Sequence, residues 1–448
     1  MAEELPIAEP FSADLQWPAN PGKGGDLLID QSLARLLMTV DGTSITEFRT
    51  EKGDGSTRLT VPLYFVVEWL ALNWWSFLYE PRKLEGAENE QDFRLRHWLG
   101  TARNGFALPD VTFSPIGDKI EVTARSASLR FARLSFVNSA TALVRTEKVR
   151  SELAGLIDAV LVRLTEGGVR KSAAHEAWEQ IKKTTAEEEP YCRLVGSLGL
   201  SPYVSREKLD SSLEDIAEKI SVSMLADLCD AANIKNFSRA VELTDNIAQQ
   251  LEKVTPSHLR KLLAAVKPVD NRPEAYEWGY QAVDAARSAL RISNDDPAGA
   301  MAFFDQMQID PKSGLVRDLS KFPIVSAAVS REDDDLTRIA LAGLSFSHRK
   351  FAAARAAFLA WSSENSASRL ATSARTRDQQ ASRAFAAELL APIRFLRKRL
   401  GDRGSDVHGD KIESIAAELE VARDVVFHQA ANNGYHVAAR SADLGVPA

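Results

Sequence analysis

The chain has 448 residues and a formal net charge of −7, and it is 45% hydrophobic and 26% charged. This is the composition of an ordinary globular protein with ample core, and the length suffices for two or three domains. The two cysteines, Cys192 and Cys229, form no C-x-x-C pair, which argues against a disulfide framework and favours a reducing cytoplasm.

Changes in composition predict an α+β, mainly helical protein of three parts behind a short tail. Residues 1–25 are rich in Pro, Gly and acidic residues. They lack the charged and apolar regions of a signal peptide, so we expect a disordered tail there. We expect an N-terminal strand-and-helix unit at 26–192, a helical middle at 193–298 and a C-terminal domain at 299–448.

Short strands are predicted at two places in the N-terminal unit. Residues 27–53 alternate and turn, and Asp41-Gly42 is a hairpin signal. Residues 109–137 predict an antiparallel meander, and its last strand alternates Leu and Phe with Arg130 and Arg133. After this meander the pattern becomes helical and stays so until a Pro- and Asp-containing linker at residues 294–299.

The longest apolar run, residues 63–79, predicts a helix. It contains Glu68 and is shorter than the roughly 20 apolar residues of a membrane span, so we expect a buried helix and no membrane partner. The run is also the most aromatic segment of the chain, with Trp69, Trp74 and Trp75. We favour core packing for these rings, and a ligand-stacking or partner-docking face is the alternative.

The C-terminal domain begins with two predicted strands, residues 323–329 and 337–343, separated by an acidic loop. A helix that starts at Phe351 follows, then a polar connection, then a second helix that ends at Pro392. The chain closes with two further predicted helices, at residues 411–419 and 422–432.

The predicted helix that ends at Pro392 contains F-A-A-E-L-L-A-P, residues 385–392. It resembles the F-A-A-x-L-L-x-P helix of the ImmA/IrrE family of zinc metallopeptidases, and the helix before it stands where that family carries H-E-x-x-H. In that motif two histidines on one helix face bind Zn²⁺, and the glutamate is the general base. The resemblance covers roughly residues 323–437 and implies a zincin-like fold. The N-terminal two-thirds resembles no well-characterised family.

The resemblance places the family's functional residues on positions that have lost them. Arg355 stands where the first histidine would be, Ala356 where the base would be, and Leu359 where the second histidine would be. The third ligand would fall near Ala381. An arginine cannot be deprotonated to bind a metal, and a zinc site needs at least three protein ligands. We therefore expect a pseudo-metallopeptidase with no metal and no cofactor.

Two other groups of residues resemble ligand sets. His175 and Glu179 share one predicted helix face, and Asp406, His408 and Asp410 alternate in a Gly-rich loop that could hold a divalent ion. We favour a solvated helix face for the first group. For the second we favour a polar loop that caps the next helix.

Residues 345–404 contain twelve Lys and Arg against four Asp and Glu, a local balance of +8 in an acidic chain. Arg394, Arg397 and Lys398 fall on one helix face, with Arg399 beside them. Four more arginines precede them and could extend this face into an anionic-ligand surface: Arg369, Arg375, Arg377 and Arg383. Pairing with the acidic remainder of the chain is the interpretation we favour.

These observations predict a non-catalytic binding or regulatory protein whose groove holds a segment of a partner protein. The resemblance implies a role in a bacterial stress, mobile-element or phage-defence response. Two alternatives stay open. The 345–404 segment could bind nucleic acid, or an enzyme site could lie in the N-terminal unit.

Overall fold

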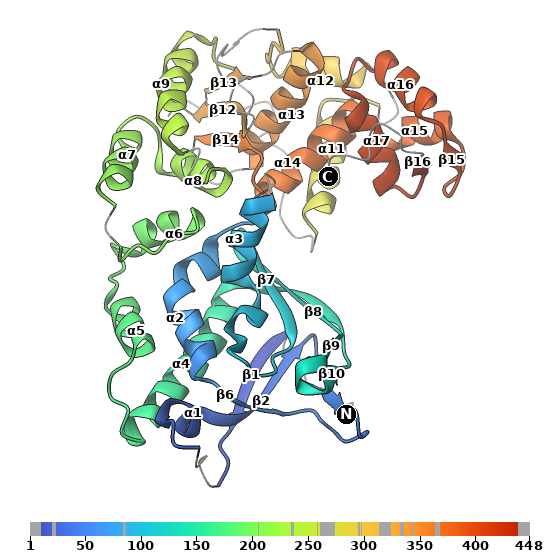
Figure 1. Cartoon of the computed structure of the whole chain (residues 1–448). Helices are drawn as coiled ribbons and strands as arrows, with labels where there is room; N and C mark the ends of the chain where they lie inside the picture. Colours follow the sequence, from blue (N-terminus) through green and yellow to red (C-terminus); the bar gives the residue numbers. More distant parts are fainter. Residues whose placement is uncertain are drawn as a thin grey trace, which may run out of the picture. The chain divides into compact units, whose positions relative to one another are not determined.

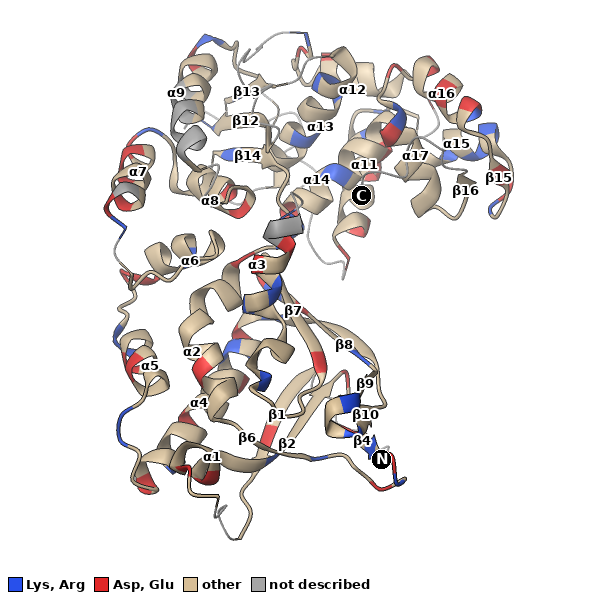
Figure 2. Ribbon diagram, in the orientation of Figure 1, with Lys and Arg blue, Asp and Glu red and all other residues tan. Residues whose placement is uncertain are grey.

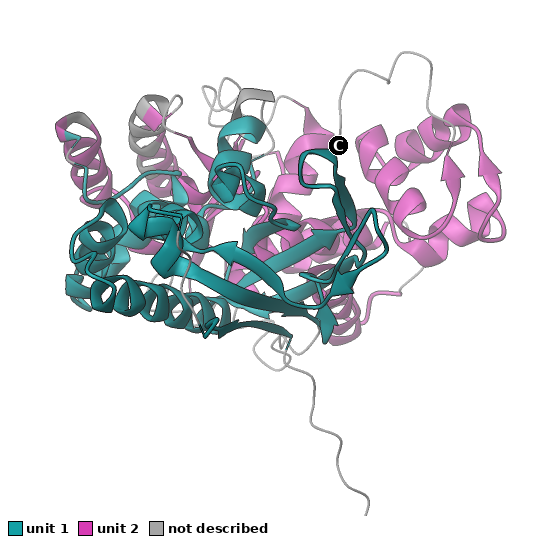
Figure 3. Cartoon of the chain, turned by 60° about the horizontal axis from the view of Figure 1, so that its bottom comes forward, with its two compact units in different colours: residues 1–206 teal, residues 207–448 magenta. Residues whose placement is uncertain are grey.

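The computed structural model describes residues 10–19, 24–83, 87–204, 206–233, 237–257, 259, 274–293, 296, 298–312, 324–331, 336–342, 345–362 and 368–437. The fold is mixed α+β with 52% helix and 20% strand, which confirms the predicted class (Figure 1). Two compact units make up the chain, and we name them unit 1 (Met1–Arg206) and unit 2 (Glu207–Ala448) (Figure 3). Across the described ranges no helix has the length and apolarity needed to cross a membrane.

The boundary between the units lies at 206, whereas the sequence placed one at 192. Residues beyond 192 remain tied to the first unit by hydrogen bonds. Trp75 Nε1 donates to the Tyr203 hydroxyl at 2.8 Å, and Ser76 Oγ donates to the Leu200 carbonyl at 3.2 Å. The part of the predicted helical middle that follows 206 falls within unit 2. Part of the predicted linker at 294–299 lies outside the described residues.

Unit 1 contains antiparallel strands in three sheets, ordered β1-β2-β3 with β6 on β2, β5-β4-β10-β9, and β11-β8-β7. The strands are β1 (Phe11–Gln16), β2 (Leu33–Val40), β3 (Thr43–Ser44), β4 (Phe48–Thr50), β5 (Gly55–Ser56), β6 (Leu59–Pro62), β7 (Asp110–Ile116), β8 (Lys119–Arg125), β9 (Ala127–Leu129), β10 (Leu134–Phe136) and β11 (Ala140–Arg145). The α-helices are α1 (Leu27–Ser32), α2 (Tyr64–Tyr79), α3 (Ala87–His97), α4 (Thr146–Glu166), α5 (Ala173–Lys183) and α6 (Glu189–Ser197).

The predicted hairpin at Asp41-Gly42 is confirmed. Val40 and Thr43 pair across it, and both turn residues have positive φ, +48° and +72°. These are the conformations of a tight hairpin turn, and Gly and Asp adopt them more readily than most residues.

Two expectations for the N-terminus were wrong. Residues 11–16 are not tail but strand β1, which pairs along its whole length with β2 and buries Phe11 against Phe113 at a ring distance of 5.8 Å. Residues 27–32 are helix rather than strand. The Asp26 side chain accepts hydrogen bonds from the amides of Leu28 and Ile29 and caps this helix. Residues 1–9 and 20–23 of the predicted tail lie outside the described residues.

The predicted aromatic helix is confirmed as α2, and its rings pack in the core of unit 1. Trp69, Trp74 and Trp75 are 7%, 2% and 3% exposed. Trp74 meets Trp178 of α5 edge to face, with ring centroids 4.9 Å apart. Core packing, the interpretation favoured from the sequence, therefore accounts for all three rings.

The last strand of the predicted meander, residues 128–137, folds back on itself. Its middle is a short 3₁₀ turn, Arg130–Ala132, followed by Arg133 at a φ of +51°. β9 and β10 on either side pair with each other. The alternation therefore does not bury Phe131, which is 60% exposed at the turn.

Unit 2 is built on a three-stranded antiparallel sheet, β13-β12-β14. The long helix α13 packs on this sheet, and α14 packs against both α13 and α11. The strands are β12 (Val325–Arg331), β13 (Thr337–Leu341), β14 (Arg369–Thr372), β15 (Asp406–Val407) and β16 (His436–Val437). The helices are α7 (Glu207–Ala217), α8 (Val222–Ala231), α9 (Phe237–Lys253), α11 (Ala275–Ala289), α12 (Gly299–Gln306), α13 (Phe346–Ser362), α14 (Arg377–Leu390), α15 (Ile393–Leu400), α16 (Gly409–Glu418) and α17 (Arg423–Asn432).

The order strand, strand, helix, helix predicted for this domain is present, with one addition. The connection after α13 contains β14, which pairs antiparallel with β12. The predicted acidic loop at 332–335 lies outside the described residues. Helices α11 and α14 cross in close contact at Gly279, where a Cβ atom would lie 2.5 Å from the Ala381 carbonyl oxygen.

Candidate functional site

Three of the four positions predicted for a lost zinc site lie in the hydrocarbon core of unit 2. Ala356 and Leu359 of α13 and Ala381 of α14 are all fully buried, at 0% exposure. They belong to the cluster of apolar side chains that joins α11, α13 and α14. None of these side chains has an atom that can bind a metal, so the residues present do not fit a zinc ion.

The fourth position, Arg355, is fixed by four hydrogen bonds. Its Nε donates to Ser382 Oγ at 3.1 Å, and Nη1 donates to Ser326 Oγ at 3.2 Å. Nη2 donates to the Thr372 carbonyl at 2.6 Å and to Gln379 Oε1 at 2.7 Å. Arg355 thus connects α13 to β12, β14 and α14 from the place where a zinc ligand was expected.

Burial, and next the charge of Arg383, hold the pKa of Arg355 well below its usual range. A guanidinium here repels a divalent cation.

A buried polar network continues from Arg355 to Asp227 of α8. Gln379 accepts from Arg355 and donates from Nε2 to Asp227 Oδ1 at 3.2 Å. Asp227 also receives both ends of the Arg369 guanidinium, at 2.8 and 2.9 Å, and the Leu370 amide at 2.9 Å. Burial alone would lower the pKa of Arg369, but the Asp227 carboxylate outweighs it and raises that pKa.

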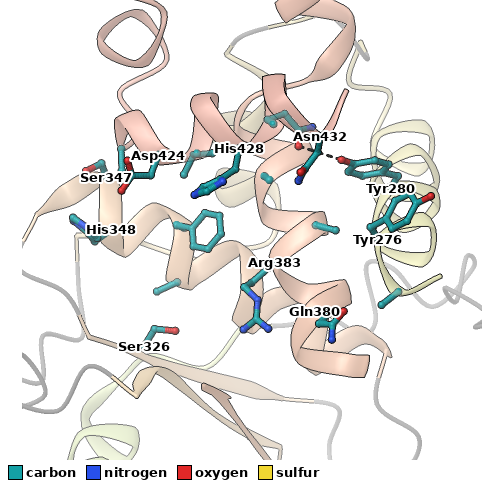
Figure 4. A pocket seen from close by; sticks show the side chains of 18 of the residues that line it. Tyr276, Tyr280, Ser326, Ser347, His348, Gln380, Arg383, Asp424, His428 and Asn432 are labelled. Carbon is teal, nitrogen blue, oxygen red and sulfur yellow. Dashed lines mark hydrogen bonds between the residues drawn. The ribbon is translucent and has the colours of Figure 1, made fainter. Parts of the chain in front are cut away.

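A pocket of about 720 Å³ lies within unit 2 beside this network, and we name it the unit 2 pocket. Helices α11, α13, α14 and α17 and strand β12 supply its walls (Figure 4). Most of its lining is apolar or aromatic and includes Tyr276, Tyr280, Val325, Phe351, Ala387 and Val425. The polar residues that line it are Glu274, Ser326, Ser347, His348, Gln380, Arg383, Asp424, His428, Gln429 and Asn432.

Arg383 is the most buried cation in the pocket wall. Its Nη1 donates to the Thr372 carbonyl at 3.2 Å and its Nη2 donates to the Ala374 carbonyl at 2.8 Å. Burial, and secondarily the charge of Arg375, lower the pKa of Arg383 to about 10. None of the carboxylates in the described ranges forms an ion pair with it.

The opposite end of the pocket holds a chain of three polar groups. The Tyr280 hydroxyl donates to Gln429 Oε1 at 3.2 Å, and Gln429 Nε2 donates to the Glu388 carboxylate at 2.5 Å. Burial raises the pKa of Glu388 to about 7. The two ends of the pocket therefore differ, with a fixed cation at Arg383 and an acid of raised pKa behind Gln429.

The predicted arginine surface does not form as a whole. Arg394, Arg397 and Lys398 lie on the exposed side of α15 and border a second hollow of about 570 Å³, which Asp284 also lines. Figure 2 colours the Lys and Arg positions of α15 blue. Arg399 instead pairs with Glu418. The arginines that precede α15 are not exposed: Arg369 pairs with Asp227, Arg377 is buried, and Arg375 and Arg383 are half-buried.

The two other groups of residues that resembled ligand sets are not arranged as metal sites. His175 Nδ1 lies 2.8 Å from the hydroxyl of Ser172, the residue that caps α5, and Glu179 pairs with Lys182 at 3.5 Å. Asp406 is in β15, and His408 stands at the N-cap of α16. Over the residues that the structure describes, no group of three or more His, Cys, Asp or Glu side chains is placed to hold a metal ion.

Sequence reasoning missed the partners of Arg355. Gln379 and Ser382 lie in the polar first half of α14, beside Asp378, Gln380 and Arg383, so their pattern did not distinguish them from solvent-facing residues. Thr372 belongs to β14, a strand that the sequence did not predict. Asp227 of α8 carried no signal because it is 152 positions from Gln379.

Comparisons with known proteins do not assign this chain to a group. It matches no family model, no curated protein and no solved structure. The resemblance of its C-terminal third to the ImmA/IrrE family therefore stays a hypothesis that depends on the sequence motif and on the order of elements in unit 2.

We expect the purified protein to contain no stoichiometric zinc, because the four predicted positions offer one guanidinium and three hydrocarbon side chains. Elemental analysis of the full chain after mild chelation measures this. One tightly retained zinc per chain would contradict the expectation. So would peptidase activity on a partner protein that survives Arg355→Ala.

Proposed function

We propose that this protein is a non-catalytic binding and regulatory protein that holds a segment of a partner protein in the unit 2 pocket. The observation that carries the proposal is the pocket itself. It has a volume of about 720 Å³ and walls from four helices. A mostly apolar cavity with a few separated polar groups is the usual form of a binding site.

The residues of α13 and α14 support binding without catalysis. Arg355 is held by four hydrogen bonds inside the fold, and Ala356 offers no base. By resemblance to the ImmA/IrrE family, the partner belongs to the regulators of a bacterial stress, mobile-element or phage-defence response. On this proposal the chain retains a substrate groove and uses it to bind without cutting.

Filling the pocket tests this proposal. Ala387 and Val425 line it from α14 and α17 and are half-buried, so Ala387→Trp and Val425→Trp place an indole inside it. Val222→Trp is the matched control, because Val222 is 69% exposed on α8 of the same unit and does not line the pocket. Each tagged variant is purified from the native host, and bound proteins are identified by mass spectrometry.

We expect one partner to accompany the wild type and the control and to be lost from both pocket variants. A partner that all four proteins retain equally would show that the pocket is not its site.

A second candidate function is nucleic-acid binding by Arg394, Arg397 and Lys398. The observation that favours it is that the three side chains border one hollow on the exposed side of α15. Against it, Asp284 lines the same hollow and Arg399 pairs with Glu418. Phe395 of the same helix is 8% exposed and unavailable for base stacking.

We expect weak or absent binding to duplex and single-stranded DNA at about 150 mM salt, in the range of nonspecific binding. Fluorescence anisotropy over a series of salt concentrations measures it. If these side chains neutralise phosphates, replacing all three by alanine must reduce the log–log salt slope by up to about three units, since each contact contributes about −0.9. Tight binding that the triple variant abolishes would favour this second function over the first.

A further inference from the structure

Two guanidinium groups meet at one carbonyl oxygen beside the unit 2 pocket. Arg355 Nη2 and Arg383 Nη1 both donate to the Thr372 carbonyl, at 2.6 and 3.2 Å. Like charges so close together repel. The pKa of Arg355 is lowered mainly by burial and secondarily by Arg383, and the pKa of Arg383 is lowered mainly by burial and secondarily by Arg375. The arrangement therefore costs free energy unless negative charge balances it.

The nearest acids are already engaged with a third arginine. Asp227 receives Arg369 at 2.8 and 2.9 Å, and Asp378 receives the same guanidinium at 2.9 Å. Three arginines thus share two carboxylates, and the surplus positive charge lies on the side of Arg355 and Arg383. A buried charge is ordinarily paired with an opposite charge. Among the described residues, no carboxylate forms an ion pair with Arg355 or Arg383, so one anion would be needed to balance this part of the network.

Of the two surplus cations, only Arg383 borders the pocket. Arg355 is 5% exposed and donates its hydrogen bonds to groups inside the fold. Figure 4 shows Arg383 projecting from α14 between Ser326 and Gln380, so a bound group reaching this spot meets a guanidinium flanked by a hydroxyl and an amide. The Ser326 hydroxyl already donates to the Ala371 carbonyl at 3.1 Å, and Gln380 Nε2 donates one of its two protons to the Arg375 carbonyl at 2.7 Å. The donors that suit a carboxylate here are therefore the Arg383 guanidinium and the second amide proton of Gln380.

The rest of the pocket offers apolar surface to a second side chain of the same bound peptide, next to the acidic residue. Phe351 of α13 and the rings of Tyr276 and Tyr280 on α11 offer apolar surface. Asp424 lies by His428 in the pocket wall, and Glu274 is a second acid in the lining. Among the described lining residues no second arginine or lysine is present for a doubly charged group. One guanidinium balances the single charge of a carboxylate, whereas a phosphate group of about −1.5 to −2 would keep an uncompensated negative charge.

We propose that the unit 2 pocket recognises an acidic peptide segment, with an Asp or Glu carboxylate bound by the Arg383 guanidinium and an adjacent aromatic or aliphatic side chain packed against Phe351. The inference rests on the proposed function, because it names the chemistry of the segment that the pocket holds. The segment's carboxylate is the anion that completes the network of Arg355, Arg369 and Arg383.

The test uses a displayed library of random heptapeptides, selected on the full-length chain and counter-selected on Val425→Trp. The dissociation constant of a selected peptide is then compared with that of the same peptide carrying Asn for Asp or Gln for Glu. Both peptides are also measured on Arg383→Gln and on the control Arg394→Gln, which changes an exposed arginine away from the pocket.

We expect selected peptides to contain an acid. Neutralising that acid, or Arg383, weakens binding about ten- to a hundred-fold, the range for a charge-assisted hydrogen bond. The two losses are not additive, since each removes the same contact, and Arg394→Gln binds like the wild type. If Arg383→Gln fails to fold, the comparison of acidic and neutral peptides on the wild type decides the question alone.

The outcomes separate this inference from the proposed function. Peptides that Val425→Trp excludes, but that contain no acid and tolerate Arg383→Gln, would overturn the inference and leave the proposed function standing. A phosphorylated analogue that binds more tightly than the carboxylate peptide would overturn the assignment of the anion. Failure to select any peptide that depends on the pocket would count against both.

Discussion

Truncating Trp74 to alanine is expected to lower the free energy of unfolding of unit 1 by about 3–5 kcal/mol, as for other large buried aromatic side chains. Trp74 is 2% exposed in the middle of α2, and its indole meets Trp178 edge to face at 4.9 Å. The truncation removes this ring pair and leaves a cavity where α2 packs against α5. Hydrogen exchange of peptides from α2 and α5, read by mass spectrometry, measures the loss within unit 1.

The matched control is Leu72→Ala on the same helix. Leu72 is 54% exposed, so its truncation changes the free energy of unfolding by no more than about 0.5 kcal/mol. A Trp74→Ala protein as stable as the wild type, but unable to bind its partner, would contradict the core assignment. It would identify the aromatic face as an interface instead.

Replacing Asp227 by asparagine is expected to destabilise unit 2 by up to about 3 kcal/mol, because Arg369 loses its buried partner and keeps only Asp378, whose side chain is 41% exposed. Asp227 and Arg369 have side chains 5% and 15% exposed. The substitution removes the one carboxylate that accepts from both Arg369 and Gln379. The remaining guanidiniums of Arg355, Arg369 and Arg383 then repel one another with less compensation. Exchange protection of β14 and α14 measures the effect.

Two further variants sharpen this test. Asp305→Asn changes an exposed acid of α12 and is expected to stay within about 0.5 kcal/mol of the wild type. Adding Arg369→Met to Asp227→Asn removes the guanidinium that has lost its buried partner and should recover part of the lost stability. An Asp227→Asn protein with wild-type protection of β14 would show that the network does not stabilise unit 2.

The elements with strong local signals were predictable from the sequence. The apolar run at 63–79 and the Asp41-Gly42 turn carry their structure within a few residues, and both are as expected. The strands that were missed have no such pattern. β14 is four residues long in a polar connection and exists because β12 offers it a partner. β1 lies in a segment of tail-like composition and is a strand because β2 pairs with it.

The candidate site was predictable only in part, for the same reason. Arg355 was identified from one helix, but its hydrogen-bond partners come from β12, β14 and α14. The pocket joins residues as distant as Tyr280 and Gln429, which are 149 positions apart. A contact of this separation leaves no local pattern. The unbalanced positive charge around Arg383 likewise appears only once Arg369 is seen to occupy both nearby acids.

The most direct test of the central claim places a photo-crosslinking amino acid, p-benzoylphenylalanine, at position 425 in the pocket or at the control position 222. The chain is expressed in its native host and irradiated, and the adducts are mapped by mass spectrometry. We predict that crosslinks from position 425 map to one contiguous segment of a single partner protein. They should disappear when Ala387→Trp is added and be absent from position 222. No adduct at 425, or the same adducts from both positions, would contradict the account.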